Sequence, residues 1–162
     1  MKVVNIYVAT DIKGVGKKKG RYIYLLETET SKGLATIHDI KEIEATRDVA
    51  ELTALVAAVG RLKQYPADLN VYVNSEQLRL NIVHYLQRWA QRNFCKQDGH
   101  RLSCWELWKA LWDKVPPLPS CSRPLIRRWI KNEAVYLSFP HSVLSALFLI
   151  PLPTAPQTDA DT

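Results

Sequence analysis

The chain has 162 residues, which is enough for one domain with its own hydrophobic core. Its formal net charge is +6 and its pI is about 9.3, so it is compatible with a nucleic-acid partner without requiring one. The three cysteines form no C-x-x-C pair, which argues against a disulfide framework or a zinc site and favours a reducing, cytoplasmic location. The most hydrophobic stretch, 143–152, is too short to span a bilayer, so no membrane partner is expected.

Three strands are predicted at the start of the chain. Residues 3–9 are rich in β-branched side chains and apolar on both faces, which indicates a central strand. Residues 22–28 and 34–43 are the next two, because the glycine-containing turns at 11–20 and 31–33 are typical of hairpins. The simplest arrangement of these strands is antiparallel.

Helices and one further strand are predicted for the middle of the chain. Residues 47–64 and 75–93 carry apolar side chains at helical spacing, and 69–73 is a fourth strand. Ser103 and Glu106 form a capping-box pattern that opens a third helix. The side chains expected to face the core are Leu52, Leu55, Val56, Val59 and Leu62 in the first helix, Leu78, Ile82, Leu86 and Trp89 in the second, and Trp105, Trp108, Leu111, Trp112 and Val115 in the third.

The C-terminal part is predicted to be less regular. Residues 115–123 are proline-rich and read as a linker, 124–131 as a short basic helix, and 134–139 as a fifth strand. The fold class is therefore α/β, with a five-stranded mixed sheet and helices packed on it. The domain is expected to span 1–142, and 143–162 to be an apolar segment followed by a disordered polar tail.

Polar side chains end two of the predicted strands. Asp11 follows the first strand and Asn74 follows the fourth, while Glu51 lies on the apolar side of the helix between them. This order can bring Asp11, Glu51 and Asn74 together at one end of the sheet, where oxygen ligands would hold Mg²⁺ for phosphodiester cleavage. Each residue also has a plainer interpretation: Asp11 in a turn, Glu51 on a solvated helix face, and Asn74 in an Asx turn or as a helix N-cap.

These motifs, in this order, resemble ribonuclease H of type 1 over about residues 2–114 and more weakly to about 142. The matching segments are IYVATDIKGVG with Asp11, AELTA with Glu51, VNS with Asn74, and LQRWAQRNFCKQDGHRLSCWELWKAL, which is the most specific. The resemblance implies a ribonuclease H-like fold. It also implies four carboxylates that hold two Mg²⁺ (or Mn²⁺) ions and cleavage of the RNA strand of an RNA–DNA hybrid.

The chain departs from the family pattern at several positions. Asn74 stands where the family has its third carboxylate, so Mg²⁺ affinity and cleavage rate are expected to fall. The family's last carboxylate has no counterpart, because no Asp or Glu follows His141 before Asp159. His141 itself matches the family's mobile histidine, with an ordinary loop histidine as the alternative. Arg47-Asp48 replaces a polar pair that contacts the hybrid, which leaves hybrid selectivity open.

Basic residues accompany both ends of the matched region. The candidates for contacts with the nucleic-acid backbone are Lys13, Arg47, Arg88, Arg92, Lys96 and Arg101, with a solvated surface as the alternative. The favoured function is binding of an RNA–DNA hybrid or other nucleic acid at a Mg²⁺ site, with cleavage impaired or lost. An active ribonuclease H and a protein-interaction module on the same scaffold are the alternatives, and 143–152 could also mediate self-association.

Overall fold

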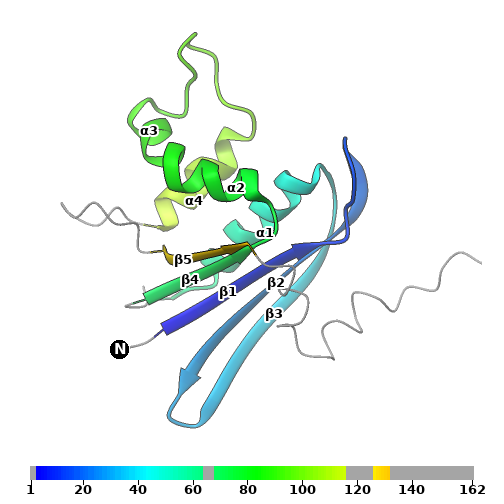
Figure 1. Cartoon of the computed structure of the whole chain (residues 1–162), viewed down its shortest axis with the longest axis vertical. Helices are drawn as coiled ribbons and strands as arrows, with labels where there is room; N and C mark the ends of the chain where they lie inside the picture. Colours follow the sequence, from blue (N-terminus) through cyan, green and yellow to red (C-terminus); the bar gives the residue numbers. More distant parts are fainter. Residues whose placement is uncertain (1–2, 64–67, 116–125, 132–162) are drawn as a thin grey trace, which may run out of the picture.

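The computed structural model describes residues 3–63, 68–115 and, as backbone, 126–131. Its elements are β1 (Val3–Thr10), β2 (Lys18–Thr30), β3 (Gly33–Ala45), α1 (Arg47–Gly60), β4 (Asp68–Val73), α2 (Glu76–Leu80), the π-helical turn η1 (Asn81–Tyr85), α3 (Leu86–Gln91), α4 (Trp105–Lys114) and β5 (Ile126–Lys131). The strands form one sheet in the order β3-β2-β1-β4-β5 (Figure 1). The predicted α/β class, with helices packed on a mixed sheet, is confirmed.

β1 lies at the centre of the sheet, as its apolar faces predict. It pairs antiparallel with β2, which in turn pairs antiparallel with β3. On its other side β1 pairs parallel with β4, and β4 pairs parallel with β5. Parallel pairing brings the carboxyl ends of β1 and β4 to the same edge of the sheet, which is where Asp11 and Asn74 follow these strands.

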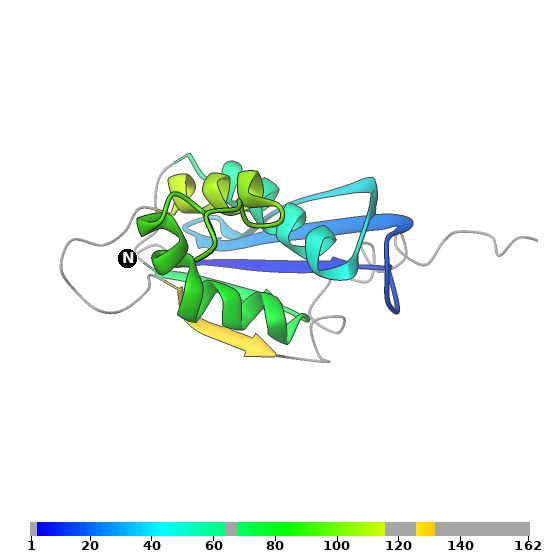
Figure 2. The same cartoon turned by 90° about the horizontal axis from the view of Figure 1, so that it is seen from above.

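The described helices all contribute to the core on one face of the sheet. β1, β2 and β4 present Val4, Ile6, Val8, Tyr24 and Val71, among other side chains, to this face. α1 packs on β1 and β2, and α4 packs in turn on α1 (Figure 2). The predicted helical stripes are confirmed, because Leu52, Leu55, Val59, Leu78, Ile82, Leu86, Trp108 and Leu111 are buried and the other stripe residues are partly buried against them.

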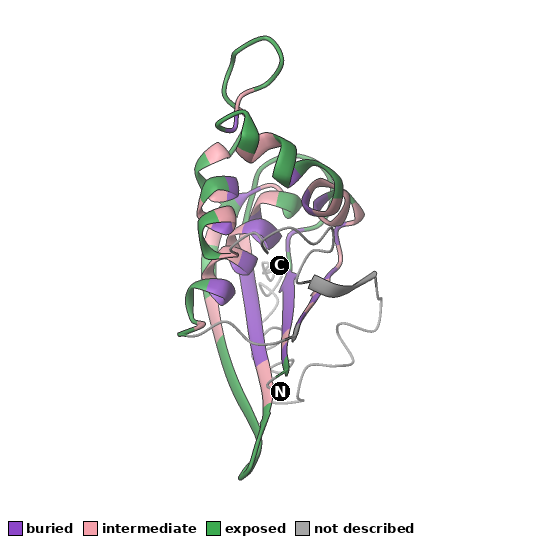
Figure 3. Cartoon of the chain, turned by 90° about the vertical axis from the view of Figure 1, so that its left-hand side faces the viewer, coloured by how far each residue is buried: buried purple, intermediate pink, exposed green. Residues whose placement is uncertain are grey.

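The opposite face of the sheet carries a second apolar cluster of Tyr7, Ala9, Ile23 and Leu25, to which the described helices contribute no side chain. Tyr7 stacks on Tyr72 of the neighbouring strand, with ring centroids 4.5 Å apart. The far end of the β2–β3 hairpin is exposed (Figure 3). No helix in the described part of the chain is long and apolar enough to cross a membrane.

The predictions for the C-terminal part are partly wrong. Residues 126–131 form β5, where a short basic helix was predicted, and they pair with β4 from Leu69 to Val73. Six residues can form few helical hydrogen bonds of their own, whereas an open strand edge offers backbone partners at once. The strand predicted at 134–139, the linker after Val115, the boundary at 142 and the segment 143–152 lie outside the described residues.

Two helix predictions are also corrected. The helix predicted for 75–93 is a run of α2, η1 and α3, and the chain leaves helical geometry at Arg92. The capping box at Ser103 does not form. Instead Cys104 precedes α4 in a left-handed conformation with φ +55°, and its carbonyl accepts the N–H groups of Leu107 and Trp108. The N-cap of α4 is therefore Cys104, one residue after the serine that the sequence pattern indicated.

Candidate functional site

Glu51 is buried within the domain. This burial agrees better with its predicted role as a site residue than with a position on a solvated helix face. Its side chain is 1% exposed, and it points from the first turns of α1 towards the end of β4. Its Oε2 accepts the backbone N–H of Ser75 at 2.9 Å, and its Oε1 lies 3.5 Å from Nε of Arg47, one helical turn earlier. Burial raises the pKa of Glu51 above its usual value, while the Ser75 N–H and Arg47 oppose that rise.

Ser75 ties the start of α1 to the segment that follows β4. Its hydroxyl donates to Oδ1 of Asp48 at 2.6 Å and accepts the N–H of Leu78 at 3.1 Å, which makes it the N-cap of α2. Together with Glu51, this side chain fixes the backbone next to Asn74. The alternative role of Asn74 as the helix N-cap is therefore wrong. Ser75 and Asp48 were missed as site residues, although a serine directly before a helical pattern is a recognisable cap signal.

Asp11 lies at the end of β1 and is held by the neighbouring strand. Its side chain is 34% exposed. Its Oδ1 accepts the backbone N–H of Arg21 at 2.6 Å, and its Oδ2 accepts Nε of the same arginine at 3.2 Å. Arg21 was also missed, but the hairpin register could have found it, because Thr10 pairs with Tyr22 and so Asp11 faces Arg21.

Close packing around Gly20 orients the Asp11 carboxylate. A Cβ on Gly20 would lie 2.6 Å from Oδ1 of Asp11 and 2.4 Å from Cγ1 of Ile12, so the strand there has no room for a side chain. An open pocket begins at this point, and it is lined by Asp11, Lys19, Gly20, Arg21, Glu42, Ile43 and Glu44. The lining mixes both charge signs, so it does not by itself select an anion or a cation.

The two predicted carboxylates belong to the same end of the sheet. Ile12, which follows Asp11, and Ala50, which precedes Glu51, share a small apolar cluster with Ala45. Asn74 is half-buried and adjoins Ser75, whose N–H binds Glu51. Within residues 3–63 and 68–115, no three His, Cys, Asp or Glu side chains gather as they would at a metal centre. The predicted set of two carboxylates and one amide thus stays a prediction, and His141 lies outside the described residues.

The donor set does not fit the pair of Mg²⁺ ions that the resemblance implies. Two such ions need several anionic oxygens that are open to them. Asp11 is paired with Arg21, Glu51 is paired with Arg47, and Asn74 supplies no charge. Both predicted carboxylate ligands, Asp11 and Glu51, therefore already have a guanidinium partner, and Asp48 accepts the Ser75 hydroxyl.

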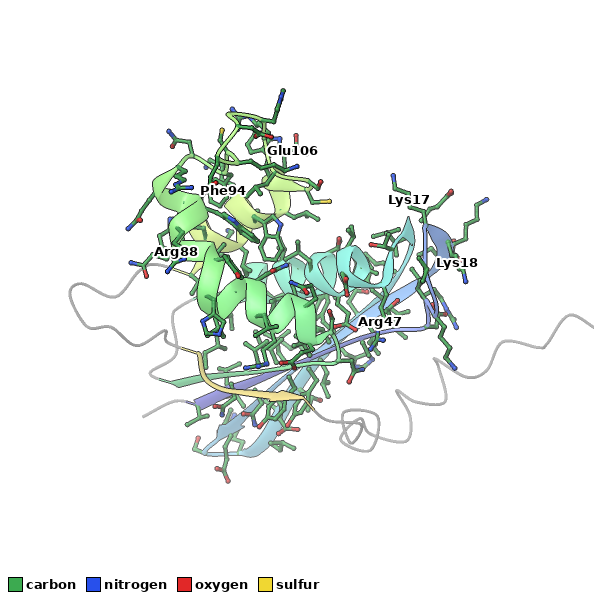
Figure 4. The ribbon with its side chains drawn as sticks, turned by 45° about the horizontal axis from the view of Figure 1, so that its top comes forward. Lys17, Lys18, Arg47, Arg88, Phe94 and Glu106 are labelled. Carbon is green, nitrogen blue, oxygen red and sulfur yellow. The ribbon has the colours of Figure 1, made fainter. Side chains whose placement is uncertain are left out.

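Predicted nucleic-acid contacts fall at separate places on the surface. Lys13, Lys17, Lys18 and Lys19 lie exposed in and beside the β1–β2 turn, which is tied by a bond from Nζ of Lys18 to the carbonyl of Lys13 at 2.9 Å. In Figure 4, Lys17 and Lys18 lie on one side, Arg88 lies on the other, and Arg47 is between them. Arg88, Arg92 and Lys96 are exposed around the end of α3.

The loop from α3 to α4 is held by backbone hydrogen bonds, and its basic residues Arg92, Lys96 and Arg101 are exposed. Phe94 is buried, and its carbonyl accepts the N–H of Leu102 at 3.0 Å, while the backbone N–H of Lys96 donates to the carbonyl of His100 at 2.7 Å. Arg101 packs over the ring of Trp105 at 3.9 Å from its centroid, which leaves it less free than predicted to reach a phosphate. The tryptophans of α3 and α4 serve as core, as expected, with Trp89 edge-on to Trp108.

Known proteins similar to this chain were found by sequence, although no protein-family model matches it. The ribonuclease H of Rickettsia bellii (strain RML369-C) is 27% identical over 93 residues, which are 57% of this chain and 56% of that protein. The ribonuclease H of Paracidovorax citrulli (strain AAC00-1) is 30% identical over 93 residues, with 57% and 60% covered. The chain thus spans somewhat more than half the length of the relatives it matches.

Solved structures with a similar fold were also found. LC9-RNase H1, described as a type 1 RNase H with the type 2 active-site motif, gives a TM-score of 0.59 at 17% identity, covering 82% of this chain and 64% of the other. The foamy viral protease-reverse transcriptase in complex with dsDNA gives a TM-score of 0.51 at 14% identity, covering 70% and 73%. At these identities the likeness shows the fold alone.

Proposed function

The chain contains a ribonuclease H-like domain, similar to type 1 enzymes in sequence and in fold, and from this premise we propose that it binds nucleic acid while cleavage is impaired or lost. The preferred ligand in this proposal is an RNA–DNA hybrid. Mg²⁺ or Mn²⁺ would have at most a weakened site, formed by Asp11, Glu51 and Asn74.

The pairing of both carboxylates with arginines is the observation that carries the loss of cleavage. A divalent cation at Glu51 would have to displace or tolerate the guanidinium of Arg47, whose Nε lies 3.5 Å from the carboxylate. At Asp11 it would compete with Arg21, which binds through both its backbone N–H and its Nε. Bound divalent metal would normally activate water and stabilise the leaving oxygen, and this end of the sheet is poorly equipped to hold it.

The exposed cations support the binding half of the proposal. The net charge is +6, and lysines of the β1–β2 turn and Arg88, Arg92 and Lys96 all reach solvent. Phosphate contacts by such side chains supply most non-specific affinity for nucleic acid. The structurally similar foamy viral protein was solved with dsDNA, which agrees with a nucleic-acid partner for this fold.

An active ribonuclease H is the second candidate, because the relatives found by sequence carry that name and this chain has Asp11 and Glu51 where its sequence resembles the family's motif. In this alternative the missing ligands are supplied from outside the matched region. Such an enzyme would depend on Mg²⁺ or Mn²⁺.

One assay separates these candidates. Labelled RNA–DNA hybrid is incubated with the full chain in EDTA, in Mg²⁺ and in Mn²⁺, and is then analysed on native and denaturing gels. A mobility shift without cutting is the expected result. RNA-strand cutting that needs the metal would overturn the loss of cleavage and support the active enzyme. Neither shift nor cutting would overturn binding and leave the protein-interaction module as the better account.

A further inference from the structure

Arg21 and Arg47 lie beside the carboxylates at the ends of β1 and β4, where the nucleic acid of the proposed function would place a phosphate. We propose that Arg47 takes the place of divalent metal there, so that the domain holds a phosphate of its ligand without any bound cation. Arg21 supports this by neutralising Asp11.

Arg47 is placed to contact two anions at once. Its partner Glu51 is 1% exposed, whereas Arg47 itself, the first residue of α1, is 48% exposed. In the described part of the chain its contact with Glu51 runs through Nε. The two terminal amino groups of the guanidinium can therefore face a phosphate oxygen, in the forked geometry that arginine offers to such groups.

Arg21 has a different role, because it is turned inwards. Its side chain is 18% exposed and its Nε binds Oδ2 of Asp11 at 3.2 Å. A bare carboxylate at the rim of the site would repel a phosphate, and a paired one repels it much less. Arg21 thus removes the local obstacle to an anion, while Arg47 provides the attraction.

The same geometry disfavours a competing metal ion. A permanent positive charge 3.5 Å from the buried Glu51 carboxylate repels a second cation there. One of the Glu51 oxygens is also already bound to the Ser75 N–H at 2.9 Å. The neutral side chain of Asn74 cannot compensate for either loss.

The test compares Arg47→Gln with Arg61→Gln, because Arg61 is an exposed arginine at the other end of the same helix. The glutamine keeps most of the aliphatic stem, and circular dichroism checks that each variant is folded. Binding of a fluorescently labelled RNA–DNA hybrid is measured by anisotropy, in EDTA and in Mg²⁺. With the ionic strength of the two buffers matched, the wild-type affinity is expected to be no higher in Mg²⁺ than in EDTA. Arg47→Gln should lose about tenfold, the worth of a charged hydrogen bond, and Arg61→Gln less than about twofold.

Different failures have different meanings. Binding by the wild type in Mg²⁺ but not in EDTA would overturn the metal-free site and leave the proposed nucleic-acid binding intact. Equal losses for Arg47→Gln and Arg61→Gln would also overturn it, since charge alone would then explain both. No binding in either buffer would overturn the proposed function itself. Calorimetric titration of the protein with Mg²⁺ alone gives an independent readout, and a saturable heat in the wild type would contradict the inference.

Discussion

Glu51 carries a buried charge that the fold only partly compensates. Burial raises the pKa of its carboxyl group above the usual value of 4.5. A carboxyl group with a raised pKa in the folded state destabilises the fold as pH rises through the unfolded value, and the full penalty is present above the folded pKa. Ionisation of Glu51 should therefore lower the free energy of unfolding of the wild type at pH 7 relative to pH 4.

Glu51→Gln tests that contribution. The amide can still accept the Ser75 N–H but never ionises, so the variant should gain stability relative to the wild type between pH 4 and pH 7. Urea unfolding of both proteins at the two pH values measures the change. The exposed Glu106→Gln serves as the control and should show no such gain. A stability difference for Glu51→Gln that does not depend on pH would refute the argument.

Asn74 is the residue at which the chain departs from the family by one functional group. Asn74→Asp restores a charge beside Glu51 and is expected to raise RNA-strand cleavage in Mn²⁺ above that of the wild type, in which it is impaired or lost. The gain should be modest, because Arg47 still pairs with Glu51. Asn81→Asp is the matched control, since it adds the same charge on η1 and keeps the oxygen that binds Gln77. Unchanged cleavage in Asn74→Asp, in a protein whose activity depends on Glu51, would show that Asn74 is not the cause.

At the scale of elements, periodic patterns predicted most of the fold. β1, β4 and α1 have apolar repeats that suit a single structure. β1 and β4 appear within one residue of the predicted bounds, and α1 begins at Arg47 as predicted but ends at Gly60, before the predicted end at 64. Residues 126–131 were misjudged because six residues fit either a strand or a helix, and only pairing with β4 decides between them. Similarly, the partners of the carboxylates depend on strand register and on the packing of α1 against the end of β4. Asp11 and Glu51 stay predicted site residues. The i,i+4 spacing on the predicted helix could have indicated the Arg47–Glu51 pair, whereas the Arg21–Asp11 pair depends on the register of the hairpin.

The loop between α3 and α4 should set much of the affinity for nucleic acid. Arg92 and Lys96 are exposed there, as is Arg88 in α3, and neutralising about three phosphates predicts a slope of log affinity against log salt of about −3. Reversal of Arg92 and Lys96 to Glu should lower affinity for every sequence about equally and make the slope shallower. Filter binding over a range of salt measures both effects. The exposed Lys109→Glu on α4 is the control. Affinity that ignores salt and the reversal would exclude this loop from the binding surface.

At the scale of the whole molecule, the helices described here cover one face of the sheet, and the other face holds the cluster around Tyr7 and Leu25. The most hydrophobic stretch of the sequence is 143–152. Its apolar side chains are expected to be covered by the domain, by a partner or by a second copy of the chain. It carries no carboxylate, so it is not expected to act as the family's last catalytic helix.

Deletion of 143–162 should accordingly change solubility or oligomeric state more than it changes metal binding. Size-exclusion chromatography of the full and shortened chains measures the first effect, and titration with Mg²⁺ or Mn²⁺ by calorimetry measures the second. Removal of the polar tail alone, 154–162, is the matched control and should leave oligomeric state unchanged, because it takes away little apolar surface. The prediction would be wrong if the shortened chain stayed equally soluble but no longer bound a metal that the full chain binds. A ligand would then lie in the tail, with Asp159 and Asp161 as the candidates, and the case for an active enzyme would be restored.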